Sequence, residues 1–232
     1  MPVTTETPAP SVIPVFPLTG SLLLPGTLLP LNIFEPRYRH LVADALSQEE
    51  EGKHIGMIQP IVPRLDNFGP MEPLLLEEIP KLYSVGCVGR IERSQQQPDG
   101  RYEIVLRGIC RFRVREELPE QRGYRRVSAD YGEFLRDVME PQVSLDPSRM
   151  LGALRAFGEA HSLEFDFGLL GSLPGISLLN GLAVALPFRP EEKQALLEAA
   201  GPMEREQLLL ALMGMGLEPL STDEYYAPPT VH

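Results

Sequence analysis

The chain has no tryptophan and only two cysteines, Cys87 and Cys110, in 232 residues. A chain of this length buries enough surface to fold without a disulfide framework. Both cysteines lie in strand-like sequence, so we expect them to be buried free thiols. The four histidines are scattered, and zinc needs three or four close ligands, so we expect no metal site.

Long apolar runs are also missing. No stretch reaches the roughly 20 apolar residues that span a bilayer. The first ten residues lack the basic residues and the apolar core of a signal peptide. We therefore expect a protein that works in the cytoplasm and has no membrane partner.

Positive charge is scarce: 21 lysines and arginines face 32 aspartates and glutamates, for a formal net charge of −11. Such a balance disfavours nucleic acid as the partner. The best case for an anion or RNA site is the arginine face, formed by Arg107, Arg111, Arg113 and Arg115. Neighbouring glutamates dilute this face, and no exposed aromatic residue interleaves it to stack on bases. We therefore interpret it as a solvated sheet face with cross-strand ion pairs.

Catalytic motifs are absent as well. The phosphate-binding pattern G-x-x-x-x-G-K-[ST] has no match, because Gly52-Lys53 is followed by histidine. The other lysines are Lys81 and Lys193, and we expect all three lysines to be solvated rather than preorganised for a Ser-Lys dyad. A Cys110–His54 nucleophile pair is disfavoured, because Cys110 shares an apolar strand face with its neighbours. We expect no enzymatic activity and no cofactor.

The chain between Val12 and about residue 131 reads as β structure. Its strongest signal is Tyr102–Val114, where apolar residues occupy the even positions and charged residues many of the odd ones. Gly108 interrupts the apolar face, which predicts a bend that lets the sheet curl into a barrel. Shorter strands are predicted at 54–58, 83–93 and 125–131.

The pattern becomes helical after Asp146. Asp146 and Pro147 suit the cap and first position of a helix. Further helices are predicted at 165–173, 176–186, 191–200 and 203–215. The fold class is therefore α+β, a curled β-barrel followed by a C-terminal helical bundle. The predicted divisions are a flexible tail (1–11), a β-rich part (12–140), a helical bundle (146–217) and a second flexible tail (218–232).

Three stretches, taken in order, resemble one known family. The first contains Ile13–Leu18, the turn Leu24-Pro25-Gly26 and Asn32–Arg39, which leads into a helix that begins at Pro36. The second is the hairpin 83–114, and the third is the helical stretch 178–212. Together they resemble the N-terminal domain of the ATP-dependent protease Lon, and most closely the stand-alone bacterial proteins that consist only of this domain.

The resemblance implies a β-barrel of the type shared with PUA domains, followed by a helical bundle. In Lon proteases this region recognises unfolded substrate polypeptides, whereas separate ATPase and Ser-Lys peptidase modules carry out proteolysis. The resemblance thus implies a non-catalytic polypeptide-binding module linked to protein quality control. The alternative is a regulatory or assembly module that binds one specific protein partner or a second copy of itself. RNA binding is a third, weaker alternative.

Apolar residues also occur where loops are expected. We expect Leu22–Leu29 to fold back onto the core, as suits a structural motif. The segment 68–76 is open between folding back and forming an exposed binding surface. Leucine and methionine in a loop can repack around varied peptides. The candidate polypeptide-binding residues are Phe68, Met71, Leu74, Leu75 and Leu76.

The missing motifs give a first prediction. The purified protein should hydrolyse neither ATP nor a casein-like substrate, because it lacks both the phosphate-binding pattern and a dyad lysine. Phosphate release and fluorescent-casein assays measure the two activities. Turnover above background that survives repurification would contradict the prediction.

Overall fold

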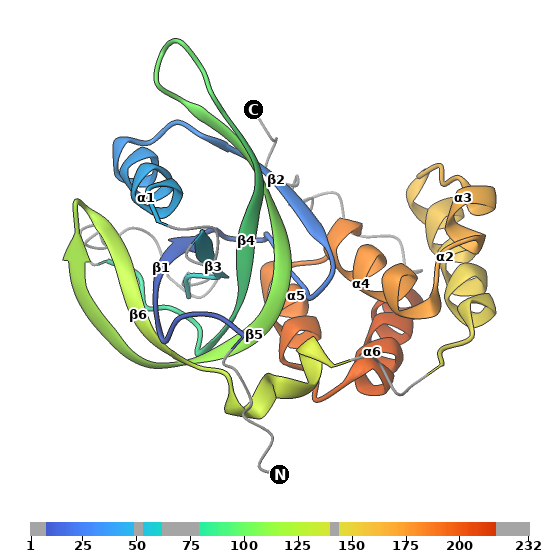
Figure 1. Ribbon diagram of the computed structural model, residues 1–232. Helices are drawn as coiled ribbons and strands as arrows, with labels where there is room; N and C mark the ends of the chain where they lie inside the picture. Colours follow the sequence, from blue (N-terminus) through green and yellow to red (C-terminus); the bar gives the residue numbers. More distant parts are fainter. Residues whose placement is uncertain (1–7, 49–52, 62–78, 140–143, 217–232) are drawn as a thin grey trace, which may run out of the picture.

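The computed structural model describes residues 8–48, 53–61, 79–139 and 144–216. A curled β-barrel and a helical bundle lie side by side (Figure 1), as the alternation and the later helical pattern predicted. Of the helices in these ranges, none is both long and apolar enough to cross a bilayer.

Most of the strands close into a ring. The strands described are β1 (Val12–Pro17), β2 (Leu28–Ile33), β3 (His54–Ile58), β4 (Val85–Gln96), β5 (Tyr102–Gln121) and β6 (Tyr124–Asp130), and all except β2 belong to the ring. The sheet order is β2-β5-β4-β3-β1-β6, and a further β5–β6 pairing closes the ring. Only β1 and β3 run parallel among the paired strands described. Strand β2 therefore stays outside the ring, on the edge of β5.

The predicted bend occurs at Gly108. The register of β4 against β5 shifts between Val88 and Gly89, and Gly89 lies opposite Gly108. A Cβ atom at Gly108 would lie 2.1 Å from the carbonyl oxygen of Leu24, so no other residue fits there. The Gly108 amide donates to the carbonyl of Thr27 at 2.9 Å. The segment 24–27, which leads into β2, therefore packs directly against the bend.

That chain enters through the Pro-Gly turn. The amide of Thr27 donates to the carbonyl of Leu24 at 3.0 Å, and Gly26 has a φ of 81°, as a type II turn with proline second requires. Leu22, Leu23 and Leu24 are buried, which confirms that they fold back. Leu29 is half-buried and packs against the core, but Leu28 is 48% exposed, so the same expectation was wrong for Leu28. Leu28 begins β2 on its outer face and cannot reach the core.

Helix α1 (Pro36–Leu46) lies between the tips of two hairpins (Figure 1). Its buried face is the predicted one, made of Tyr38, Leu41, Val42 and Ala45. The tip of the β5–β6 hairpin is Arg122-Gly123, whose φ values of 51° and 85° fit a type I′ turn. On α1, Asp44 accepts hydrogen bonds from Arg122 and from the Tyr124 hydroxyl. These contacts fasten the helix to the barrel.

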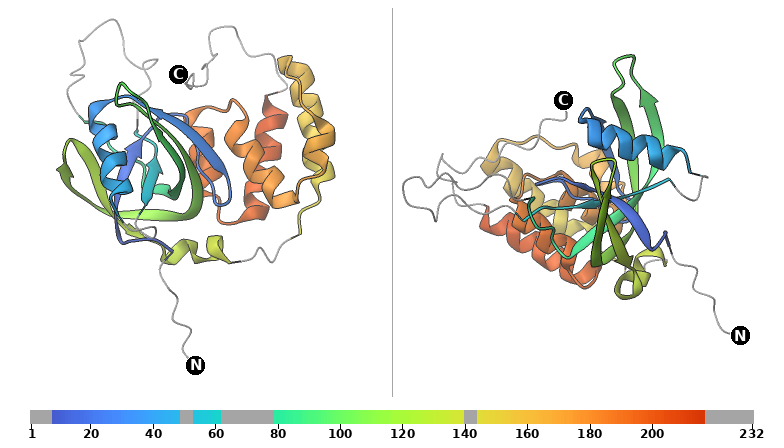
Figure 2. Two further views of the ribbon diagram at one scale, coloured as in Figure 1. Left: turned by 45° about the horizontal axis from the view of Figure 1, so that its top comes forward. Right: turned by 90° about the vertical axis from the view of Figure 1, so that its left-hand side faces the viewer.

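The helical part begins with the 3-10 helix η3 (Gly132–Val138), which the sequence did not predict. It continues with α2 (Pro147–His161), α3 (Phe167–Gly171), α4 (Gly175–Ala185), α5 (Pro190–Glu198) and α6 (Pro202–Met215). Asp146 caps α2 as predicted, since its carboxylate accepts from the Ser148 amide at 2.9 Å. Helix α6 packs against α2, α4 and α5. Figure 2 shows that the bundle covers one flank of the barrel.

Phe112 gives a test of the strand faces. Its side chain is fully buried on the apolar side of β5, as the alternation predicted. Phe112→Ala should therefore cost about 3–5 kcal/mol of unfolding free energy, measured with denaturant. Arg115→Ala on the same strand is the control, and its exposed ion pair should cost less than about 1 kcal/mol. A loss below about 1 kcal/mol for Phe112→Ala would contradict this burial.

Candidate polypeptide-binding surface and the interface beside it

The candidate residues Phe68, Met71, Leu74, Leu75 and Leu76 lie outside the described residues. The two chain segments that lead into and out of 62–78 are described, and they pair with each other. The Ile61 amide donates to the carbonyl of Lys81 at 2.7 Å, and the Tyr83 amide donates to that of Gln59 at 3.0 Å. We call residues 59–61 and 79–83 the stem.

The stem carries two exposed apolar side chains. Ile61 is 44% exposed and Ile79 is 66% exposed. The buried Arg125 of β6 holds the stem to the barrel, because its guanidinium donates to the Pro80 carbonyl at 2.8 Å and pairs with Glu117. Exposed apolar surface therefore flanks the segment that the sequence singled out. Sequence analysis missed both isoleucines, although each lies next to a proline in an apolar stretch.

The stem also meets the bundle, through Gln59. Its amide nitrogen donates to the Pro190 carbonyl at 2.9 Å and to Gln194 at 3.2 Å. Gln194 in turn donates to the Val85 carbonyl at 3.1 Å. These contacts tie the first and middle turns of α5 to β4 and to the end of β3. The stem is therefore anchored on the same helix that docks the bundle.

Arg111 holds the other end of α5. Its guanidinium donates to both carboxylate oxygens of Asp137, at 2.8 and 2.9 Å. It also donates to the carbonyls of Leu197 and Ala199, at 2.9 and 2.6 Å. Phe134 lies against the guanidinium, 4.6 Å from its carbon to the ring centre. A bidentate pair of this kind is strong and directional.

The burial of Arg111 corrects the expectation of a solvated arginine face. Its side chain is only 4% exposed. The alternation correctly places Arg111 on the side of β5 that faces away from the barrel core. The helical bundle covers that side at this point, so the side chain is buried between the two parts of the molecule.

The rest of the arginine face is as expected. Arg107 pairs with Glu92 across β4 and β5, and Arg115 pairs with Asp130 across β5 and β6 at 2.8 Å. Arg113 pairs with Glu133 at 2.7 Å. The hydrogen bond from Arg107 lowers the pKa of Glu92. These pairs are exposed, so they contribute little to stability.

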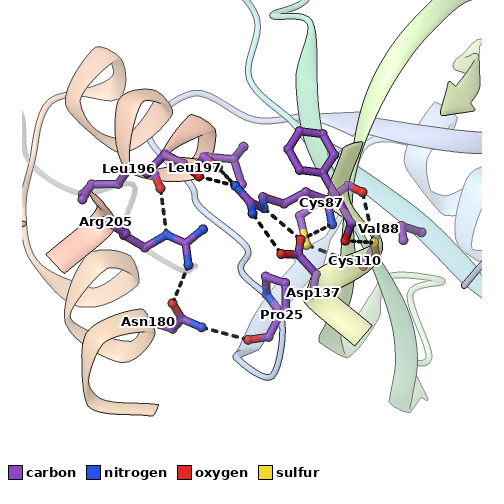
Figure 3. Close-up of polar contacts among 12 residues, drawn as sticks. Pro25, Cys87, Val88, Cys110, Asp137, Asn180, Leu196, Leu197 and Arg205 are labelled. Atoms are coloured by element: carbon purple, nitrogen blue, oxygen red, sulfur yellow. Dashed lines mark hydrogen bonds and ion pairs between the residues drawn. The ribbon is translucent and has the colours of Figure 1, made fainter. Parts of the chain in front are cut away.

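A second buried arginine, Arg205, reaches the same helix end (Figure 3). It donates to the Leu196 carbonyl at 2.9 Å and to the side-chain oxygen of Asn180 at 3.0 Å. Asn180 donates onward to the Pro25 carbonyl at 3.1 Å. Loss of hydration lowers the pKa of Arg205 to about 10. The negative end of the α5 dipole offsets the buried charges of Arg111 and Arg205.

Cys87, Cys110 and Lys193, which the sequence disfavoured as nucleophiles or dyad residues, are all buried. Cys87 and Cys110 are free and buried, as predicted. Burial raises the pKa of Cys110 to about 12, which leaves almost no thiolate to act as a nucleophile. Lys193 is 7% exposed and donates to the Val184 carbonyl at 3.0 Å, so the expectation that it is solvated was wrong. It caps the last turn of α4, and burial lowers its pKa.

Comparison with known proteins gives a consistent family. A family model described as the ATP-dependent protease La (Lon) substrate-binding domain matches residues 12–214. The chain is similar to Lon protease 2 of Sorangium cellulosum, with 28% identity over 94% of this chain and 26% of that protein. It is also similar to Lon protease of Dictyoglomus thermophilum, with 30% identity over 90% of this chain and 25% of that protein. The chain thus spans about a quarter of the length of these curated relatives.

Solved structures agree. A Lon N-terminal domain protein from Xanthomonas campestris shares 26% identity and a TM-score of 0.55, over 86% of this chain and 97% of that one. The N-terminal domain of Lon protease from Mycobacterium avium complex shares the fold, with a TM-score of 0.58 over 88% of this chain and 98% of that one, at 16% identity.

The buried side chain of Arg111 should contribute far more to the free energy of unfolding than the exposed side chain of Arg113. Arg111→Met leaves the Asp137 carboxylate, whose side chain is only 11% exposed, and two helix carbonyls without their partner, so it should cost about 3–5 kcal/mol in denaturant unfolding. Arg113→Met is the matched control, because it removes an exposed arginine from the same strand and should cost less than about 1 kcal/mol. Equal losses for the two variants would show that the Arg111 contacts do not hold the bundle.

Proposed function

The chain belongs to the Lon substrate-binding domain family, and from this premise we propose that it is a non-catalytic module that binds unfolded or partly unfolded polypeptides. We further propose that this binding serves protein quality control. The observation that carries the proposal is the pair of exposed isoleucines on the stem. Exposed apolar side chains of this kind are suited to the apolar segments that unfolded chains present.

The chemistry of the flanked segment supports the same surface. It contains Phe68, Met71 and three leucines in a short stretch. Methionine and leucine adapt to partners of different shape, which suits a module with many clients. Burying one such side chain on binding contributes about 1.5–3 kcal/mol. A few of them together give useful affinity without a deep pocket. We therefore propose the stem and residues 68–76 as the binding surface.

Proteolysis is not part of the proposal. The matched family model describes a substrate-binding domain, and the two buried cysteines and Lys193 are held in structural contacts. Within the described ranges, histidine, cysteine, aspartate and glutamate side chains form no group of three or more that could hold a metal ion. Peptide-bond hydrolysis therefore has no assigned residue in the part of the chain that is described.

A second candidate function is favoured by the bundle. Helix α3 has no buried residue, and Leu163 and Leu169 near it are 38% and 62% exposed. An apolar patch on a folded surface also suits one specific protein partner or a second copy. A pull-down with native and denatured forms of the same proteins separates the two functions, because a client-binding module captures the denatured forms preferentially.

Replacing Phe68, Met71 and Leu75 together by Ser tests the proposed surface. If these residues contact clients, affinity for a denatured, fluorescently labelled protein should fall at least about tenfold, or roughly 1.4 kcal/mol. Stability should change little, since exposed apolar groups contribute little to folding. Fluorescence anisotropy and thermal melting measure the two effects.

The control is Leu163→Ser with Leu169→Ser, which removes exposed apolar area from the bundle instead. This control should leave client affinity unchanged. A lower melting temperature with intact client affinity in the triple variant would show that the segment packs on the core. Loss of affinity only in the control would favour a surface on the bundle.

A further inference from the structure

A change of register separates the stem from the β3–β4 ladder. Met57 lies opposite Cys87 in the ladder, and the next pair is Pro60 opposite Leu82 in the stem. The chain takes three steps from 57 to 60 but five steps from 82 to 87, so the second stem segment has two additional residues. The regular strand spacing of the ladder therefore does not continue into the stem.

The stem is also weakly held by its own main chain. Pro60 and Pro80 have no N–H and cannot donate to the opposite segment. Within the described residues, the bonds across the stem come from the amides of Ile61 and Tyr83. A two-stranded ribbon this short is marginally stable at best in water. Contacts with other parts of the molecule therefore decide how the two stem segments lie relative to each other.

The side chain of Gln59 lies at the register change and is only 2% exposed. Its Oε1 accepts from the Gly20 amide at 2.8 Å. Its Nε2 donates to the Pro190 carbonyl at 2.9 Å and to Gln194 at 3.2 Å, so both amide hydrogens and the oxygen are used. A buried amide without partners is costly, so this one placement of the side chain is strongly favoured.

Gln194 of α5 contacts both sides of the register change. Its Oε1 accepts from Gln59, which begins the first stem segment, and its Nε2 donates to the Val85 carbonyl at 3.1 Å. Val85 belongs to the longer side, just after the second stem segment. The same Nε2 donates to Glu198 at 2.7 Å, which orients the amide along the helix. One side chain of α5 thus holds the bases of both stem segments.

Other polar contacts of the barrel and bundle do not combine these roles. Arg125 donates to the Pro80 carbonyl and so fixes the second stem segment to β6. Asn180 of α4 joins the bundle to the barrel through the Pro25 carbonyl, in the turn before β2. The interface therefore contains buried amides that reach the stem and a buried amide that joins the two parts elsewhere, and their effects can be compared.

We propose that Gln59 and Gln194 are positioning residues for the proposed binding surface. This amide pair fixes the relative placement of the two stem segments, and with it the placement of Ile61 and Ile79. Side chains that are already arranged lose less entropy on binding than side chains that the client must order. Client affinity therefore depends on the docking of α5 against the barrel. The proposal rests on the proposed function and assigns control of its surface to the helical bundle.

The test replaces each amide by a side chain of similar volume. In Gln59→Met and in Gln194→Met, affinity for a denatured, fluorescently labelled protein should fall at least about tenfold, measured by fluorescence anisotropy. The double variant should lose little more than either single variant, because the two amides act as one unit. Asn180→Leu is the matched control, and its affinity should stay within about twofold of the wild type.

Hydrogen exchange adds a readout that a general loss of stability would not produce. The amides of Ile61 and Tyr83 donate across the stem. Relative to amides of the β2–β5 ladder, they should exchange at least about tenfold faster in the two glutamine variants. Asn180→Leu should leave this ratio unchanged. Thermal melts set a temperature at which the wild type and the variants are folded. Gln194→Met carries the test if Gln59→Met does not fold, because it leaves the other Gln59 contacts in place.

The outcomes separate this proposal from the proposed function. Wild-type affinity in a folded glutamine variant would overturn the positioning role, and so would an equal loss of affinity in Asn180→Leu. In both cases the proposed function stands, since the wild-type protein still binds the denatured client. If the wild-type protein binds no denatured client, the proposed function fails and the positioning proposal fails with it.

Discussion

One buried guanidinium joins three parts of the molecule. Arg111 comes from β5, Asp137 from η3, and the carbonyls of Leu197 and Ala199 from the end of α5. Each contact satisfies a group that would otherwise be costly to bury: a charge, a carboxylate, and helix carbonyls without intrahelical partners. The arrangement therefore has one low-energy geometry, and movement of the bundle along the barrel would leave several groups unpaired at once.

This constraint explains why such short helices are stable in place. Helix α5 has nine residues, too few to be stable alone in water. It is bonded to the barrel at its first turn through Gln59, in its middle through Gln194, and at its end through Arg111. The same Gln59 belongs to the stem. The exposed isoleucines are therefore carried on a rigid support, and rigidity lowers the entropy that binding must overcome.

Much of the fold was predictable because local patterns report local structure. Alternation placed Phe112 in the core, and the Asp146-Pro147 pair marked the start of α2. Alternation separates the two faces of a strand but does not say what covers the outer one. Arg111 is covered by α5, which lies far along the chain, and Lys193 donates to a carbonyl of α4. Sequence patterns do not report such distant contacts, so both side chains were expected to be solvated. Ile61 and Ile79 were missed because an exposed isoleucine has the same sequence signature as a buried one.

Gly108 links the shape of the barrel to the position of the bundle. Its missing side chain admits the turn that contains Pro25, and the Pro25 carbonyl accepts from Asn180, which in turn accepts from Arg205 of α6. The bend in β5 thus determines where α4 of the helical bundle contacts the barrel. A barrel without this bend would not place the Pro25 carbonyl where Asn180 of α4 can donate to it. The helical bundle therefore could not be combined with a differently curved barrel without losing this contact.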